Sequence, residues 1–338
     1  MTLKAECKPS NTLPESIAET RLKSIYLPIK SELSQVEEEI AGACSAIGPA
    51  GSGSYLLRAG GKRIRAALVL LSSLYGNDPA PEVIRLAASV EILHLATLVH
   101  DDLIDYSDSR RGAPTVNKIW GRNAAILAGD YLYALFLEHA AGLGKPIFSS
   151  IAVSLRNMVK AEILQLQLLY NCDISERDYV ARTYLKAGSF LSCCSRLGAE
   201  LAGAPEKVRR ALERYGWFMG IAFQIKDDIL DFLGDETSLG KPVAQDLRQG
   251  VLTLPVIHAL NNSPERHQIR TLIEKKELSA TTLQFIIREL ENCGSLSYSA
   301  RILKRYARLA GRALAPLPEN QARNSLEALL DFVITREL

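Results

Sequence analysis

The chain carries one pattern of aspartates twice, at residues 101–105 and at residues 227–231. In each copy two adjacent aspartates precede two apolar residues and a third aspartate, at the end of a long apolar run with helical spacing. The first and last aspartates of a copy therefore lie one turn apart on one helix face, where like charges destabilise a helix unless cations compensate. If the two helices face each other, six carboxylates converge on one cavity.

Six converging carboxylates require cations, because two like charges about 4 Å apart repel by roughly 4 kcal/mol at an effective dielectric constant of about 20. Oxygen ligands favour a hard ion, Mg²⁺ ahead of Mn²⁺ or Ca²⁺. The alternative is that the aspartates form two solvated acidic helix ends. The occurrence of the pattern in two copies, each flanked by basic residues, disfavours this alternative. The sequence therefore predicts a Mg²⁺ site at Asp101, Asp102, Asp105, Asp227, Asp228 and Asp231.

Basic residues flank both copies of the pattern. They lie at residues 110–111, at Lys241 and in the Gly-Gly-Lys-Arg-Ile-Arg segment at 60–65, with Lys186 midway along the chain. Each basic cluster alone is better explained as a solvated surface. Together with metal-binding carboxylates they suit a diphosphate, whose oxygens metals bridge and whose remaining charge Arg and Lys neutralise.

These motifs, in this order, resemble those of the trans-type polyprenyl diphosphate synthases, and of their medium-to-long-chain (hexaprenyl to octaprenyl-like) branch. The resemblance extends from about residue 55 to 260, and the C-terminal helices match only in general character. It rests on residues 60–65 (Gly-Gly-Lys-Arg-Ile-Arg), 100–105 (His-Asp-Asp-Leu-Ile-Asp), 110–115 (Arg-Arg-Gly-Ala-Pro-Thr), 128–131 (Ala-Gly-Asp-Tyr), 223–231 (Phe-Gln-Ile-Lys-Asp-Asp-Ile-Leu-Asp) and 239–242 (Leu-Gly-Lys-Pro).

Apolar spacing predicts an all-α protein, and the resemblance implies a single large helical bundle of the isoprenoid synthase type around a central cavity. No linker divides the chain, so we expect one domain over 1–338, with about 1–15 a flexible segment. Residues 237–251 are predicted to be a loop over the site. Helices are expected at about 17–46, 54–75, 82–106, 121–143, 147–170, 176–203, 206–233, 253–261, 265–276, 280–292, 296–313 and 319–336.

Composition narrows the functional class. A net charge of +2 argues against nucleic acid as a partner. No signal-peptide pattern and no run of eighteen uninterrupted apolar residues is present, so we expect a cytoplasmic protein without a transmembrane segment. A peripheral membrane contact for product release stays open. The six cysteines show no metal-ligand spacing, and Cys193-Cys194 is interpreted as a pair of buried thiols.

The resemblance implies an ionisation, condensation and elimination reaction between isopentenyl diphosphate and an allylic diphosphate. Asp101, Asp105 and Asp227 would ligate Mg²⁺, with Mn²⁺ as a substitute, and the other aspartates would support them. The allylic diphosphate would be held by Arg110, Lys186 and Lys241. Isopentenyl diphosphate would be held by Lys62, Arg65, His94 and Arg111. Gln224 is also predicted to bind substrate, whereas His100 is interpreted as a helix-packing residue.

Two departures from the family pattern affect these expectations. Lys186 is followed by Ala187 where the family usually has threonine, so a hydroxyl near the developing cation is missing. Ala66 stands where proline usually follows Arg65, and Ala161 replaces a glycine before Glu162 and Gln165. These departures make a slow or unusual enzyme conceivable, but both aspartate patterns are intact.

The product length is predicted from the turns before Asp101. In the family an aromatic residue five positions before this aspartate closes the channel for the growing chain, and here that position is Ala96. We therefore expect an open channel beside Ala96, Thr97 and Leu93 and a product of six to eight isoprene units, for a quinone side chain. The alternative is that Ala96 only permits close helix packing. Candidates for the channel floor are Phe136, Leu164 and Leu168.

Other functions stay open at this stage. They are a shorter-chain farnesyl or geranylgeranyl diphosphate synthase, a class I terpene cyclase, a head-to-head synthase and a noncatalytic subunit of a heteromeric synthase. A cyclase or head-to-head enzyme would not need the basic residues at 62, 65 and 111, and a noncatalytic subunit would be expected to lose the aspartates. A homodimer is implied by the resemblance alone.

Overall fold

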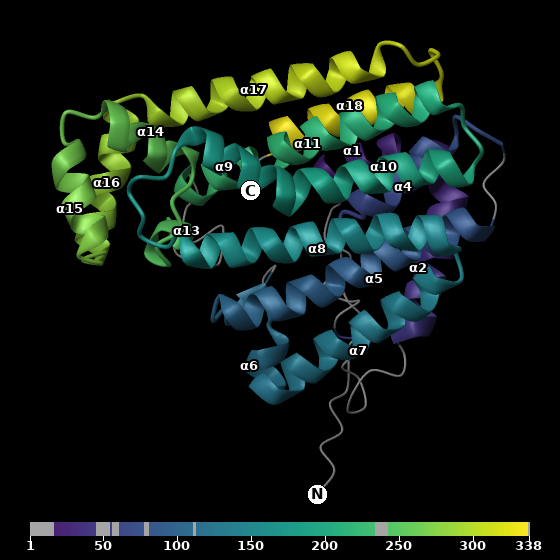
Figure 1. Ribbon diagram of the computed structural model, residues 1–338, viewed down its shortest axis with the longest axis horizontal. Coiled ribbons are helices and arrows are strands. Elements are labelled where there is room, and N and C mark those ends of the chain that lie inside the picture. The colour runs from purple at the N-terminus through teal and green to yellow at the C-terminus, as the bar shows by residue number, and fades with distance from the viewer. Residues whose placement is uncertain are drawn as a thin grey trace, which may run out of the picture.

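The computed structural model describes residues 17–44, 55, 61–77, 81–110, 113–233 and 243–336. Helices make up most of this part of the chain and pack side by side as a bundle (Figure 1). The predicted all-α class is therefore confirmed. Arg111 and Lys241, both predicted site residues, lie outside the described residues.

The first half of the chain supplies the helices that carry the first aspartate pattern. Its elements are α1 (Ile17–Ile25), the 3₁₀ helix η1 (Leu27–Ile29), α2 (Lys30–Cys44), α4 (Ile64–Ser73), α5 (Pro81–Ile104), β1 (Ser109–Arg110), β2 (Ala113–Pro114), α6 (Val116–Trp120), α7 (Arg122–Ala141) and α8 (Lys145–Gln167).

The second half carries the second pattern on a long helix, followed by shorter ones. Its elements are α9 (Glu176–Thr183), the π-helix η2 (Tyr184–Gly188), α10 (Ser189–Leu201), α11 (Glu206–Leu233), α13 (Gln245–Arg248), α14 (Leu254–Asn262), α15 (Arg266–Glu274), α16 (Ala280–Asn292), α17 (Ser295–Leu314) and α18 (Gln321–Thr335).

Several expected helices are interrupted, each for a local reason. The helix predicted over 17–46 is broken at η1, because Pro28 lacks the amide hydrogen that a helix interior requires. The helix predicted over 176–203 contains the π-turn η2. The antiparallel pair β1–β2 and the short helix α6 were not predicted, and α13 forms inside the expected loop. A capping box begins α9, since the Ser175 hydroxyl accepts a hydrogen bond from the Asp178 amide and the Asp178 side chain accepts one from the Ser175 amide.

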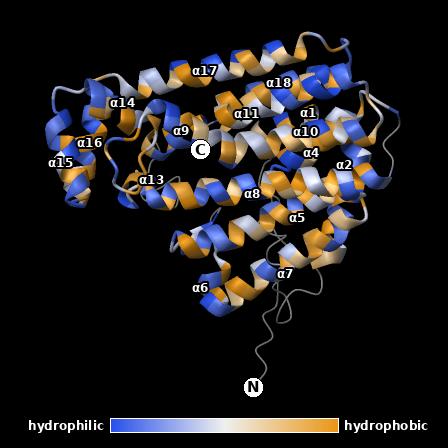
Figure 2. Ribbon diagram, in the orientation of Figure 1, coloured by the Kyte–Doolittle hydropathy of each residue, from blue (hydrophilic) through white to orange (hydrophobic). Residues whose placement is uncertain are grey.

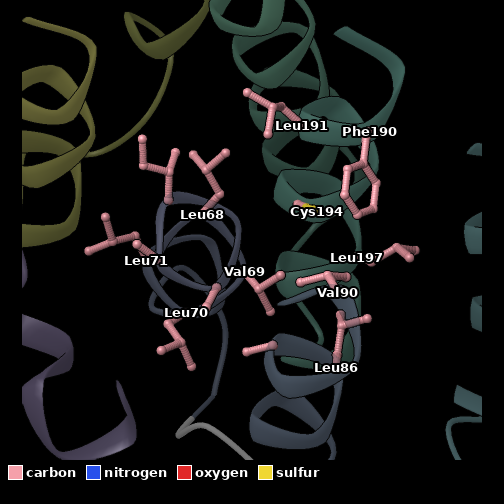
Figure 3. Close-up of a cluster of buried hydrophobic side chains, with 14 of the residues drawn as sticks. Leu68, Val69, Leu70, Leu71, Leu86, Val90, Phe190, Leu191, Cys194 and Leu197 are labelled. Carbon is pink, nitrogen blue, oxygen red and sulfur yellow. The ribbon is translucent and has the colours of Figure 1, made fainter. Parts of the chain in front are cut away.

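Two groups of buried apolar residues hold the bundle together. The larger unites α4, α5, α7 and α10, and Figure 3 shows part of it, with Leu68, Val90 and Cys194 among the labelled side chains. The smaller unites the second half of α11 with α13–α17. α11 contributes to both groups, with Met219 in the larger one and with Ile225, Ile229 and Phe232, which flank its aspartates, in the smaller one. Cys193 and Cys194 are both unbridged, but only Cys194 is buried as expected, and Cys193 is partly exposed.

Helix α5 is apolar enough, over its length, to cross a membrane, but 72% of the relevant window is buried inside the protein. A helix that is apolar on all sides is also typical of the centre of a large bundle. α5 packs against α2, α4 and α7. This packing directs its C-terminal turn, with the first aspartates, toward α8, η2 and α11.

Candidate active site

Two cavities adjoin each other where α5 and α11 end. The larger, about 720 Å³, is lined mainly by α1, α4, α5 and α11. The smaller, about 260 Å³, is lined by α5, α7, α8, η2, α10 and α11. Arg65, His94 and Gln224 line both cavities, together with Ile64 and Phe223. The site therefore has two compartments with a shared wall, and three of the predicted substrate-binding residues form that wall.

The smaller cavity holds Asp101 and Lys186 at its polar end. The Lys186 ammonium is 2.9 Å from a Glu162 oxygen, so the cation is positioned by α8. Burial raises the pKa of Asp101 to about 7, against a lowering by Lys186 and with further repulsion from Glu162 and Asp105. The negative charge in this compartment is therefore only partly compensated by the protein's own cations.

Lys186 owes its position to an irregular helix. It lies in the π-turn η2, a feature that often occurs at functional sites. At Gly220 of α11, an added Cβ would come within 2.6 Å of the Cα of Gly188, so the glycines let η2 approach α11 closely. Ala187, at the centre of η2, lines the smaller cavity.

The larger cavity holds Asp227 among cations. Its carboxylate is paired with the Arg336 guanidinium, which lies 4.1 Å from the centre of the Phe223 ring. Burial raises the pKa of Asp227, while Arg336, Lys62 and Arg65 lower it. Arg336 was not predicted as a site residue. It reaches Asp227 because α18 packs on α4 and α11 and ends beside the cavity.

The second aspartate of each pattern is buried and held by the protein. Asp102 accepts a hydrogen bond of 2.7 Å from Nε of Arg110, and Nη2 of the same guanidinium forms an ion pair with the same carboxylate oxygen at 2.7 Å. Asp228 accepts hydrogen bonds from the Tyr179 hydroxyl at 2.5 Å and from the Gln224 amide at 2.8 Å. These contacts agree with the supporting role expected for Asp102 and Asp228.

Asp231, the last aspartate of the second pattern, is also held by hydrogen bonds within the protein. It accepts hydrogen bonds from the backbone amides of Gln245 and Asp246, at 3.0 and 3.1 Å, and so fixes the start of α13. Burial raises the pKa of Asp246 to about 7, with repulsion from Asp228 and Asp105. Asp246 therefore adds a seventh aspartate to the site, from the segment that was expected to be only a loop.

Electrostatics connect the two aspartate patterns. The buried Arg65 guanidinium lies within the fields of both Asp227 and Asp101. The Gln249 amide donates a hydrogen bond of 3.2 Å to the backbone carbonyl of Asp105, which ties the segment after α13 to the end of α5. The two patterns therefore border one charged region, although Asp101 and Asp227 line different cavities and the six carboxylates do not converge on a single one.

Within the described residues, no three His, Cys, Asp or Glu side chains are close enough to form a metal cluster by themselves. The residues nevertheless fit divalent cations. Asp101 and Asp246 are oxygen donors whose pKa values rise to about 7 because burial and neighbouring carboxylates disfavour their charge, a condition that a bound cation relieves.

A set of ion pairs and hydrogen bonds around the buried Arg63 holds the segment that carries the cations of the larger cavity. Arg63, in a left-handed conformation just before α4, donates hydrogen bonds of 2.6 and 2.9 Å to Glu37 and lies 3.6 Å from Glu91. Glu91 also accepts a hydrogen bond from the Ala66 amide. This arrangement fixes the backbone that presents Lys62 and Arg65. Glu91 could have been suspected from the sequence, because it is a single charge within an apolar helical run.

The apolar end of the smaller cavity differs from the expectation. Thr97 lines it, but Ala96 and Leu93 are fully buried and line neither cavity. The predicted floor residues Phe136, Leu164 and Leu168 do not line it either. The reason is helix rotation, since α5 turns Thr97 and His100 toward the cavity and Ala96 into the packed core. The walls are instead Tyr133, Leu155, Met158, Val159, Phe190 and Leu191.

His94 and His100 occupy different surroundings. His94 lines both cavities, whereas His100 packs on Gly129 of α7, where an added Cβ would lie 2.1 Å from its ring. The His100 ring also contacts the smaller cavity. His94 therefore faces both cavities and its ligand role stays a prediction, whereas His100 both packs on α7 and lines the smaller cavity.

An all-helical bundle that encloses two cation- and carboxylate-lined compartments has the architecture of an isoprenoid synthase. Comparison with known proteins agrees. The sequence model of the family described as "Polyprenyl synthetase" matches residues 50–290. The chain belongs to this family, and the expected class of enzyme, a polyprenyl diphosphate synthase, is confirmed.

Individual relatives extend over nearly the whole chain. Component 2 of heptaprenyl diphosphate synthase from Geobacillus stearothermophilus is 38% identical over 320 residues, covering 94% of this chain and 99% of that protein. A short chain isoprenyl diphosphate synthase from Methanothermobacter thermautotrophicus is 35% identical, covering 84% and 89%. A Caulobacter crescentus polyprenyl synthase, solved with calcium and isoprenyl diphosphate, superposes with a TM-score of 0.86 at 30% identity, covering 93% and 98%.

Proposed function

We propose that this enzyme adds isopentenyl diphosphate repeatedly to an allylic diphosphate and makes a medium-to-long all-trans chain. The observation that carries the proposal is the pair of adjoining cavities. One is rich in cations, and the other has Asp101 and Lys186 at one end and apolar walls at the other. The two substrates share a diphosphate head group but have hydrocarbon tails of different length, so they need two compartments that differ in the same way. A terpene cyclase would need only one.

In this assignment the larger cavity binds isopentenyl diphosphate through Lys62, Arg65 and His94. The smaller binds the allylic substrate, with Lys186 on its diphosphate and its tail along the apolar wall. Mg²⁺, held by Asp101, Asp105 and Asp227, would supply positive charge that stabilises the departing diphosphate. The calcium in the Caulobacter structure supports a divalent ion, and the all-oxygen donors favour Mg²⁺, with Mn²⁺ as a substitute.

The residues act by orientation and charge rather than by covalent catalysis. Breaking the allylic C–O bond leaves a carbocation and free diphosphate, which Lys186 holds. The double bond of isopentenyl diphosphate attacks that carbocation, and loss of one proton, to the departed diphosphate, restores an alkene. Arg110 contributes less directly than the sequence suggested, because its guanidinium is bonded to Asp102 while it lines the larger cavity.

Product length provides the test of this function. Labelled isopentenyl diphosphate with farnesyl diphosphate should give products of six to eight isoprene units, resolved by thin-layer chromatography. Ala96→Phe should shorten them to fifteen or twenty carbons, because the ring must leave the packed core for the channel. Cyclised products, or none, would contradict the proposal, and an unchanged length in a folded variant would show that the tail does not pass Ala96.

We further propose that the chain is one cytoplasmic domain that acts as a homodimer. Among the described residues, fourteen large apolar side chains are exposed, and eight of them lie on α7 and α8, which favours an interface there. They are Ile126, Leu127, Tyr131, Leu137, Val153, Val159, Ile163 and Leu166. The relative named component 2 supports a second possibility, a heteromeric partner. Activity and mass of the purified chain alone distinguish these assemblies.

A further inference from the structure

Helices α11 and α17 together form a surface that the proposed reaction does not use. α17 contains five Lys or Arg residues and no acidic residue. All five are exposed, and four of them, Arg301, Arg305, Arg308 and Arg312, recur every three or four positions, which places them on one side of the helix over about 17 Å. The fifth is Lys304. α17 lies along one edge of the bundle (Figure 1), and hydrophobic residues alternate with the hydrophilic ones along it (Figure 2).

The start of α11 adds a second row of cations. Lys207, Arg210 and Arg214 are exposed at the same helical spacing. α11 and α17 pack on each other, and their facing ends border a groove of about 660 Å³. Phe218 and Leu309 line this groove beneath the basic side chains. The groove therefore has an apolar floor and a cationic rim.

Internal ion pairs do not account for these charges. Within the described residues, none of the salt bridges involves α17. Glu206 is the one acidic residue in the groove lining, and it already accepts hydrogen bonds from Arg196 and Arg210. The whole chain has a net charge of only +2, so this local excess of positive charge is a property of the surface and not of the protein as a whole.

Aromatic residues continue the row on α11. Trp217 is 39% exposed and stacks on Phe218, with ring centres 5.4 Å apart. Phe218 in turn lies 6.4 Å from the Tyr306 ring of α17. Exposed tryptophan beside lysine and arginine is typical of surfaces that rest on a lipid bilayer, where the ring occupies the head-group layer and the cations meet anionic phosphates.

We propose that the surface of α11 and α17 docks the enzyme on anionic phospholipid. The occupant is a bilayer and not an acidic protein, because this surface combines an apolar groove with an exposed indole beside it and two linear rows of cations. This assignment of partner rests on the proposed function, since a long prenyl product is destined for a membrane. It adds to that function a defined contact surface, remote from the aspartates at the other end of α11.

Vesicle sedimentation tests the proposal. The purified full chain should bind vesicles of phosphatidylglycerol and phosphatidylcholine in equal amounts, at low salt, and should not bind phosphatidylcholine alone. The test variant Arg305→Gln/Arg308→Gln/Arg312→Gln should bind about a hundredfold more weakly, given the contribution of each cation at an anionic surface. The matched control is Arg266→Gln/Lys275→Gln/Arg288→Gln, which removes the same charge from exposed sites on or next to α15 and α16. It should change binding less than about threefold.

A spectroscopic readout locates the contact independently of charge. In a Trp120→Phe variant the remaining tryptophan is Trp217, and its emission should shift to shorter wavelength on phosphatidylglycerol vesicles. Absence of vesicle binding, equal losses in the two triple variants, or an unshifted emission would overturn the proposal. Binding to polyglutamate but not to vesicles would assign the surface to an acidic protein instead.

Elongation of farnesyl diphosphate in vesicle-free buffer separates this proposal from the proposed function. Both triple variants should elongate like the unmodified chain. Elongation without vesicle binding overturns only the docking surface, whereas vesicle binding without elongation contradicts only the proposed enzyme activity.

Discussion

The two aspartate patterns have the same spacing but face different compartments. Asp101 lies in the smaller, partly apolar cavity with Lys186, whereas Asp227 lies in the larger, cationic cavity with Lys62. Their neighbours Asp102 and Asp228 are alike in being buried, but one is held by an arginine and the other by a tyrosine and an amide. The repeated sequence pattern therefore does not give repeated surroundings, because the two copies face different helices.

The largest expected effect is on turnover. Asp101→Asn and Asp227→Asn should each lower elongation by orders of magnitude, and a chelator should abolish it until Mg²⁺ is restored, because both side chains are proposed to ligate the metal. Circular dichroism should show both variants folded. If either variant, or the unmodified chain in chelator, keeps nearly full turnover, the metal assignment is refuted. The two patterns would then no longer share the proposed role of Mg²⁺ ligation.

The pH dependence should distinguish the first pattern. With a pKa of about 7, Asp101 is mostly protonated at pH 6 and mostly ionised at pH 8, so the Mg²⁺ concentration for half-maximal elongation should fall about tenfold between them. The raised pKa of Asp101 has the opposite effect on the free energy of unfolding of the metal-free protein, which should decrease as pH rises. The native state holds the proton that the unfolded state has released, so stability falls as pH rises from about 4 to 7. An unchanged Mg²⁺ concentration for half-maximal elongation between pH 6 and pH 8 would contradict the raised pKa of Asp101.

Stability should distinguish the two buried neighbours. Asp228→Ala leaves the fully buried Tyr179 hydroxyl and the Gln224 amide without their acceptor, and should lower the free energy of unfolding by about 1–3 kcal/mol. Asp102→Ala should cost less, because Arg110 is 27% exposed and can be rehydrated. Urea unfolding measures both. Tyr179→Phe should reduce the loss caused by Asp228→Ala, and equal costs for Asp102 and Asp228 would remove the distinction.

The smallest expected effect concerns the position beside Lys186. Ala187→Thr should raise turnover a few fold, because a hydroxyl lining the smaller cavity adds a dipole near the developing cation. Steady-state elongation rates measure it, with Ala187→Val as a control of similar shape that lacks the hydroxyl. An unchanged or lower rate with threonine would show that the compartment is built around alanine.

Much of the fold followed from local pattern. The long helices α5, α8 and α11 were predicted because their apolar spacing continues over many turns without an interior proline of the kind that breaks the predicted first helix at Pro28. The β1–β2 pair and α13 were missed, since two to four residues carry too little periodicity to detect. The π-turn at 184–188 was missed because it depends on the packing of Gly188 against Gly220.

The residues themselves determined which chemistry the chain can perform. Six aspartates in two helical turns, with lysines and arginines at fixed distances along the chain, already require a cation-assisted diphosphate site. Tertiary structure alone decided which partner each charge meets. Asp228 meets Tyr179 across 49 residues and Asp227 meets Arg336 across 109, and helix rotation turns Thr97 rather than Ala96 to the cavity. Helical periodicity sets which side chains share a face, but the surroundings of that face depend on helices distant in sequence.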